Sequence, residues 1–97
     1  MKVRFLPPAR VELVEAIGYY EAQVSGLGST FAHEIKAALT RIDQFPTAWQ
    51  SLSPRTRRYL LRQFPYGVIY AVRDNEIVVV AIAHQHRKPD YWKNRLS

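Results

Sequence analysis

The strongest pattern in the chain is a pair of apolar runs separated by a two-residue turn signal. Residues Tyr66 to Val72 are rich in β-branched and aromatic side chains, which favour a β-strand. Asp74 and Asn75 follow, and both residue types tolerate the positive φ angles of a tight hairpin loop. Residues Glu76 to His84 are then apolar almost without interruption, which predicts a return strand that is buried on both faces and central in its sheet.

Two further strands are expected. The nearer one covers Arg57 to Phe64, and the proline after it marks its end because proline cannot donate a ladder hydrogen bond. At the N-terminus, Lys2 to Leu6 alternates apolar and polar positions, which predicts a short strand at an edge of the sheet. The connection Pro46 to Pro54 is expected to be irregular, with Trp49 and Leu52 pinned to the core.

Two helices are predicted between the first strand and this connection. The first begins about Pro8, since proline is tolerated in the first helical turn, and ends at Gly26, which suits the left-handed conformation. Its apolar stripe consists of Leu13, Ala16, Ile17, Tyr20 and Val24. The second helix is expected to be capped by Ser29 or Thr30 and to end at Pro46. Its apolar stripe consists of Phe31, Ile35, Ala38, Leu39, Ile42 and Phe45.

These elements together predict an α+β fold in the order β-α-α-β-β-β. The short link between the helices makes them an antiparallel hairpin, and the surface that their apolar stripes must cover is one face of a small, mostly antiparallel sheet. A chain of 97 residues is expected to form one domain over residues 1–97. The tail from Pro89 to Ser97 is expected to add a helical turn or two, with Trp92 docked.

The net charge of +6 at pH 7 is concentrated in the second half of the chain. Residues 1–54 carry five basic and five acidic side chains, whereas residues 55–97 carry nine basic and three acidic ones. The predicted strands therefore carry most of the positive field, which fits an anionic partner such as nucleic acid or an acidic protein segment. The alternative is a basic solvated face that serves solubility.

Composition excludes several kinds of chemistry. The chain has no cysteine, so it has neither a disulfide framework nor a thiolate nucleophile. His84 and His86 share one side of a strand, but zinc needs a third protein ligand, so we expect neither a metal nor a cofactor. We see no signal peptide or membrane span and expect a soluble, cytoplasmic protein without a membrane partner.

Several segments, taken in order, resemble the RelE/ParE toxin superfamily of bacterial type II toxin–antitoxin modules. The resemblance covers nearly the whole chain, and its carriers are Val3-Arg4-Phe5, Tyr19-Tyr20-Glu21, Gly26-Leu27-Gly28, Arg58, the segment from Arg62 to Tyr66, and the segment from His84 to Trp92. The Arg-x-Phe-Pro-Tyr and His-x-x-Arg patterns look more like the ParE and plasmid-stabilisation branch than like RelE.

The resemblance implies a small growth-inhibiting toxin that a cognate antitoxin silences in a hetero-oligomer. ParE-like toxins act on DNA gyrase, which makes gyrase the expected target. The alternative is a RelE-like, ribosome-dependent endoribonuclease that cleaves messenger RNA, and a further alternative is an antitoxin-binding module with weak or lost toxicity. Fold alone does not choose among them, so whether the chain is an enzyme stays open.

Candidate site residues differ between these readings. A nuclease would use arginines to hold phosphate and histidines or a tyrosine to move protons, and its candidates are Arg62, His84, His86, Arg87 and Tyr91. His84 has the alternative role of a hydrogen-bonded structural residue. A binding surface for target or antitoxin has as candidates Arg58, Arg62, Arg73, Arg87 and Trp92. Arg58 and Arg62 are expected to project from one face of a strand towards phosphate or an acidic antitoxin segment.

Overall fold

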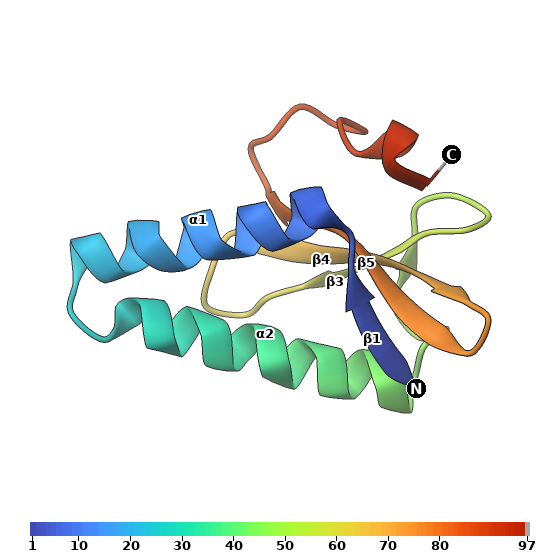
Figure 1. Ribbon diagram of the computed structural model, residues 1–97, viewed down its shortest axis with the longest axis horizontal. Helices are drawn as coiled ribbons and strands as arrows, with labels where there is room; N and C mark the ends of the chain where they lie inside the picture. The colour runs from blue at the N-terminus through green and yellow to red at the C-terminus, as the bar shows by residue number, and fades with distance from the viewer. Residues whose placement is uncertain (97) are drawn as a thin grey trace.

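A five-stranded sheet with the order β1-β5-β4-β3-β2 is the framework of the fold in a computed structural model that describes residues 1–96 (Figure 1). β1 runs parallel to β5, and the other neighbours are antiparallel. The elements are β1 (Lys2–Phe5), α1 (Pro7–Gln23), α2 (Leu27–Gln44), β2 (Gln50–Ser51), β3 (Arg57–Leu60), β4 (Tyr66–Arg73), β5 (Glu76–His84) and a 3-10 turn (Lys93–Leu96). The predicted α+β fold, with a helical hairpin on a mostly antiparallel sheet, is confirmed.

The β4–β5 hairpin forms as its sequence predicts. Asp74 and Asn75 adopt φ angles of 51° and 59°, the left-handed region that a two-residue hairpin turn requires. β5 lies between β1 and β4, and its apolar residues are buried on both faces. The pairing shifts at one point, where Ile69 pairs with Ala81 and Tyr70 with Val79, so that Val80 has no partner on β4. This bulge leaves the Val80 carbonyl group available to another segment.

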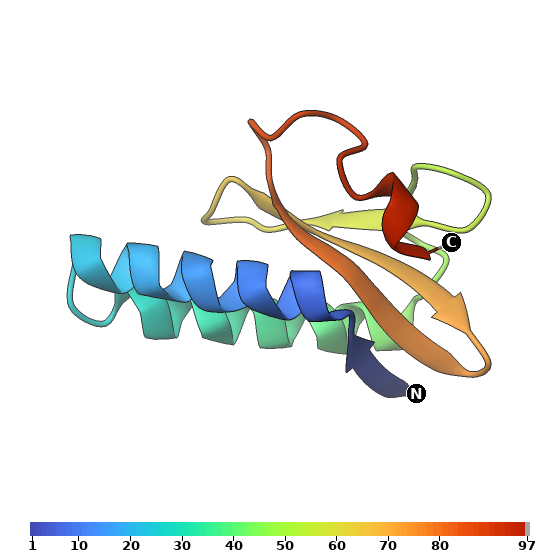
Figure 2. The same ribbon diagram turned by 45° about the horizontal axis from the view of Figure 1, so that its top comes forward.

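The helical hairpin covers one face of the sheet. Figures 1 and 2 show α1 and α2 lying side by side in one layer beneath the strands. The core between the layers contains an aromatic cluster in which the Tyr20, Phe31, Phe64 and Tyr66 rings contact one another with centroids between 4.7 and 6.1 Å apart. Such contacts add to burial and hold the two layers together near the connection between α1 and α2.

The second helix begins earlier than predicted. α2 starts at Leu27, so the predicted cap at Ser29 or Thr30 is wrong. Gly26 precedes the helix with φ = 89°, and the carboxylate of Glu21 on α1 accepts the backbone N–H groups of Gly26 and Gly28 at 3.0 and 3.1 Å. A side chain of the first helix therefore supplies the cap, which frees the second helix from needing a polar residue of its own.

The third strand is shorter than predicted. β3 ends at Leu60, because the backbone N–H groups of Arg62 and Gln63 donate to the Glu34 carboxylate on α2 instead of to a strand. The connection before β3 contains the two-residue strand β2, which the sequence did not indicate. The prediction that Trp49 and Leu52 pack on the core is confirmed.

The C-terminal segment covers the sheet face that the helices leave open. Figure 2 shows this segment, drawn in red, turning back from the end of β5 over the sheet. Trp92 and Leu96 dock there, with 7% and 9% of their surfaces exposed, against residues of β4 and β5. The docked Trp92 and the helical turn of the predicted tail are confirmed, while Ser97 lies outside the described residues. Within residues 1–96, no helix has the length and apolar character to cross a bilayer.

Two glycines give a matched test of the helical hairpin. A Cβ added at Gly28 would lie 2.6 Å from the Ile17 carbonyl oxygen, whereas a Cβ at Gly18 would have no neighbour within 4 Å. We expect Gly28→Ala to lower the free energy of unfolding by roughly 1–3 kcal/mol through overpacking. Gly18→Ala should raise it by roughly 0.5–1 kcal/mol, since alanine loses less backbone entropy within a helix. Urea unfolding followed by circular dichroism measures both, and equal stabilities of the two variants would contradict the close α1–α2 contact.

Candidate functional site

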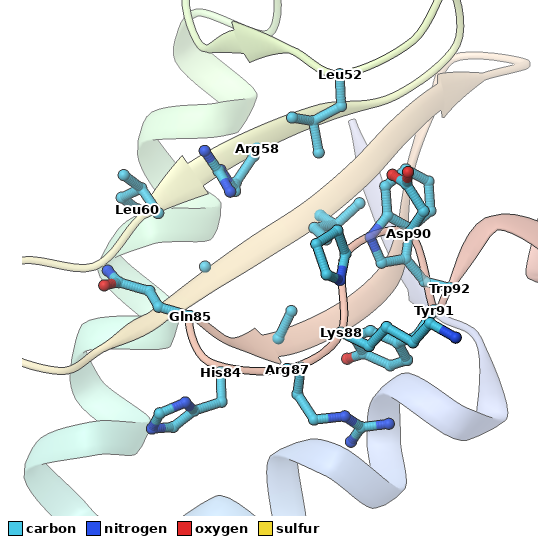
Figure 3. Close-up of a pocket in the computed structure, with 14 residues that line it drawn as sticks. Leu52, Arg58, Leu60, His84, Gln85, Arg87, Lys88, Asp90, Tyr91 and Trp92 are labelled. Atoms are coloured by element: carbon cyan, nitrogen blue, oxygen red, sulfur yellow. The ribbon is translucent and has the colours of Figure 1, made fainter.

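A groove lies on the tail-covered side of the sheet, between β3 and the segment that follows β5. We call it the C-terminal groove; its volume is about 220 Å³, and it is lined by Leu52, Arg58, Leu60, Gly67, Ile69, residues 83–85 and residues 87–92. Figure 3 shows Arg58 on one wall, with the segment from His84 to Trp92 forming the other. Its cations are Arg58, Arg87 and Lys88, and its one acidic lining residue is Asp90. The balance of charge favours an anionic group in the groove.

Arg58 is held in place by its neighbours. Its Nη2 donates a hydrogen bond to Gln50 Oε1 at 2.7 Å. Its aliphatic stem lies against Gly67, where an added Cβ would come within 3.1 Å of the Arg58 Cγ. Its Nε is buried and has no acceptor within residues 1–96. The guanidinium is therefore fixed while part of its donor capacity stays unused.

A carboxylate on α1 ties the C-terminal segment down. Glu12 accepts two hydrogen bonds from the Arg95 guanidinium, at 2.9 and 3.0 Å, and one from the Tyr91 hydroxyl at 2.7 Å. It also accepts the backbone N–H of Ile82 at 3.1 Å. Arg95 Nη1 in turn donates to the Val80 carbonyl oxygen, at the bulge in β5, at 3.0 Å. The bidentate pair and its companions join α1, β5 and the tail at one point.

Tyr91 is a structural member of this network. Burial, followed by the hydrogen bond to Glu12, raises the pKa of Tyr91 well above its ordinary value. The Arg87 and Arg95 guanidinium carbons lie 3.9 and 5.0 Å from the centroid of its ring. The hydrogen bond to Glu12 raises the pKa of Arg95, which keeps that guanidinium charged. The Tyr91 proton is thus held against α1, away from a position where it would serve as an acid in the groove.

The histidines pack on each other at the end of β5. The His84 Nδ1 accepts the backbone N–H of His86 at 3.0 Å, and their rings lie 5.2 Å apart. The His84 ring also meets Tyr66 edge to face at 5.0 Å. Because Nδ1 accepts, the proton of a neutral His84 resides on Nε2. Sequence alone left open a structural role for His84, and these contacts are of that kind. His86 is exposed.

The remaining candidate site residues lie at different places in the structure. Arg62 follows β3 instead of lying within it, so the expectation that Arg58 and Arg62 project from one face of a strand is wrong. Arg62 lines a different groove at the edge of the sheet. Arg73 lies at the far end of β4, in a third hollow with Arg55 and Arg57. The C-terminal groove thus brings together Arg58, His84, Arg87, Tyr91 and Trp92.

Sequence reasoning missed two residues that shape this site. Lys88 extends the basic pair begun by Arg87, and that adjacency was a usable signal. Glu12 gave no signal, because its partner Arg95 lies 83 residues away and the spacing of α1 marks Glu12 only as polar. Within residues 1–96, no three histidine or acidic side chains gather as a metal site would require.

Comparisons with known proteins agree on one family. Residues 3–89 match the sequence profile described as "ParE toxin of type II toxin-antitoxin system, parDE". The chain is 31% identical over 87 residues to Toxin ParE2 of Mycobacterium tuberculosis, in strains CDC 1551 / Oshkosh and H37Rv, which covers 89% of this chain and 83% of that protein. It shares its fold with a solved chain described as a chromosomal ParDE TA system from P. aeruginosa. That match has a TM-score of 0.75 at 18% identity and covers 87% of this chain and 95% of the other.

Replacing Glu12 tests the junction of α1, β5 and the tail. The Glu12→Gln variant leaves Arg95 without its charged partner, and breaking a largely buried ion pair costs roughly 3 kcal/mol of unfolding free energy. Glu15→Gln, an exposed change on the same helix, should stay within about 0.5 kcal/mol of the parent. Urea unfolding of both variants measures the difference. If Glu12→Gln proved as stable as Glu15→Gln, the network would not hold the tail.

Proposed function

Since the chain belongs to the ParE toxin family of type II toxin–antitoxin systems, we propose that it arrests growth by binding DNA gyrase and that a cognate antitoxin neutralises it in a hetero-oligomer. On this proposal the protein acts in the cytoplasm, where gyrase works. The gyrase target follows from the ParE-like character of the sequence, and the chemistry of the C-terminal groove supports a binding role.

One observation carries the choice of a binder over a catalyst. Two of the groups that acid–base catalysis would need are engaged within the protein, since the Tyr91 hydroxyl donates to Glu12 and the His84 Nδ1 accepts from the His86 backbone, whereas the His86 side chain is exposed. Arg58 and Lys88 contribute charge to the groove without making an ion pair within residues 1–96. Fixed positive charge beside apolar lining residues suits recognition of an acidic protein surface.

Helix α1 supports the antitoxin part of the proposal. Its outer side exposes Val11, Val14 and Tyr19, with 55%, 63% and 60% of their surfaces accessible. The core-facing side of the same helix is also apolar, so apolar residues occur on both sides of α1, alongside the exposed polar residues Arg10 and Glu15. Helices of that kind are normally covered on both sides, and a cluster of exposed apolar residues marks a protein contact. An antitoxin segment that packs on α1 would provide the cover.

The RelE-like alternative keeps one observation in its favour. Arg58, Arg87 and Lys88 converge on a groove that also contains His84, and such a set would hold the phosphate of an RNA strand. The two functions stop different syntheses first, so a time course in cells separates them.

Pulse labelling within minutes of inducing the chain without antitoxin tests the target. We expect thymidine incorporation to fall while amino-acid incorporation continues, because blocked gyrase stops replication before translation. Expression of the antitoxin from the neighbouring gene should restore thymidine incorporation. Early loss of amino-acid incorporation would instead indicate the ribosomal nuclease, and normal growth without antitoxin would indicate weak or lost toxicity.

A matched pair of lysines tests the C-terminal groove directly. Lys88 lines the groove, whereas Lys36 is exposed on α2. In a supercoiling assay with purified gyrase, Lys88→Gln should need about fivefold more protein for half inhibition, because a surface charge pair contributes about 1 kcal/mol. Lys36→Gln should match the parent while changing the net charge equally. Equal potency of the two variants would move the gyrase contact away from the groove.

A further inference from the structure

The edge of the sheet beyond β2 is unpaired next to Leu60. β2 pairs only with Arg57 and Arg58, and the chain before Gln50 turns away. The backbone N–H of Leu61 donates to the Tyr66 carbonyl oxygen, towards β4. Because backbone groups alternate in direction along a strand, the N–H and C=O of Leu60 point the opposite way, to the open edge. Its side chain is 46% exposed. The edge is therefore ready to pair with an extended chain.

A second groove of about 430 Å³ runs along this edge, and we call it the edge groove. It is bounded by Arg41 from the end of α2, by Trp49 and Gln50, and by residues 58–60 and 62. The lining includes no carboxylate. Glu34, which lies behind the loop after β3, is engaged by the backbone N–H groups of Arg62 and Gln63. Three guanidinium groups thus face a groove that contains no opposite charge.

Two residues that line the edge groove, Trp49 and Arg58, each have a buried donor nitrogen. Trp49 Nε1 and Arg58 Nε are both buried, and neither has a partner within residues 1–96. Tyr59 accepts from Arg41 Nη1 at 2.7 Å, which leaves its own hydroxyl hydrogen available. These two nitrogens have almost no accessible surface, so an acceptor in the groove would meet the arginines that line it and not these atoms.

We propose that the edge groove binds an extended, carboxylate-bearing peptide segment that adds a strand beside Leu60. The unpaired backbone and the exposed Leu60 side chain favour a peptide over inorganic phosphate, while the arginines of the groove favour carboxylates. Within a toxin–antitoxin module the source of this segment is the antitoxin, so the inference rests on the proposed function. It deepens that function by locating one antitoxin contact at a sheet edge.

Binding in the edge groove would also affect the C-terminal groove, because the two grooves share Arg58. Its side chain lines both the edge groove and the C-terminal groove. A carboxylate that binds Arg58 from the edge groove withdraws its charge from the C-terminal groove, where we place the target. Neutralisation then needs no antitoxin residue inside the C-terminal groove itself.

The two tryptophans allow a direct binding test by nuclear magnetic resonance. The ¹⁵N-labelled protein has two indole N–H signals, from Trp49 and Trp92. The probe is a synthetic hexapeptide of alternating Glu and Val, compared with a Lys–Val hexapeptide and inorganic phosphate. We expect the Glu–Val peptide to shift the Trp49 indole and Leu60 amide signals and to leave the Trp92 indole signal in place.

Charge variants sharpen the same experiment. Arg62→Gln should weaken binding of the Glu–Val peptide about tenfold, whereas Lys36→Gln, with the same change in net charge, should leave it unchanged. The proposal is overturned if the Trp49 indole signal does not respond, if the Lys–Val peptide shifts it equally, or if phosphate alone reproduces the shift.

A gyrase assay separates this inference from the proposed function. Arg41 lines the edge groove but not the C-terminal groove. Arg41→Gln should inhibit gyrase as the parent does, yet need about tenfold more of the neighbouring gene's antitoxin for neutralisation. If Arg41→Gln were neutralised as easily as the parent, the proposal that the antitoxin binds in the edge groove would be wrong, while the proposed toxin function would be unaffected. If the parent itself fails to inhibit gyrase, or Arg41→Gln does not fold, the peptide titration and Arg62→Gln decide the edge groove alone.

Discussion

The carboxylate of Glu12 is the contact on which the arrangement of this protein depends. It accepts four hydrogen bonds: one from the backbone of β5 near its bulge, one from the Tyr91 hydroxyl and two from the Arg95 guanidinium. Its directional hydrogen bonds fix the orientation of the C-terminal segment against α1, which apolar contacts alone do not do. The position of the C-terminal groove follows from this junction, because the segment that forms one wall runs between β5 and Arg95.

Two other helical carboxylates work in the same way. Glu21 accepts backbone N–H groups at the start of α2, and Glu34 accepts them in the loop after β3. Glu12, Glu21 and Glu34 of the first half of the chain are thus bonded to other segments of the chain, while several arginines and lysines of the second half line grooves at the surface. The uneven charge seen along the sequence becomes an uneven charge in space. This asymmetry gives the sheet side of the molecule a positive field, which favours anionic partners.

Local patterns predicted local structure well. The β4–β5 hairpin, the burial of β5 and both helices could be predicted from the sequence. The signals for them, which are β-branched runs, a two-residue turn and helical spacing, each lie within a few neighbouring residues. The errors have a shared physical cause. The start of α2 and the end of β3 are set by Glu21 and Glu34, which bond to backbone groups several or many residues away. Sequence reasoning placed Arg58 and Arg62 together because it extended β3 past the residue where Glu34 ends it. The composition of the C-terminal groove could be predicted in part, since His84 and Arg87 lie only three residues apart in the sequence. The roles of Tyr91 and Glu12 depend on a contact that spacing cannot reveal.

The parallel pairing of β1 with β5 bears on how the protein is made. Arg4 and Glu76 are joined across that pair at a separation of 72 residues, and Glu12 meets Arg95 at a separation of 83. Helices form from neighbouring residues, so α1 and α2 can appear early in synthesis, but the sheet that they cover is closed only by strands made later. Loop closure of this length slows folding. During synthesis on the ribosome, the chain therefore exists for some time as helices whose apolar sides are uncovered, and the C-terminal groove is complete only after Arg95 has emerged.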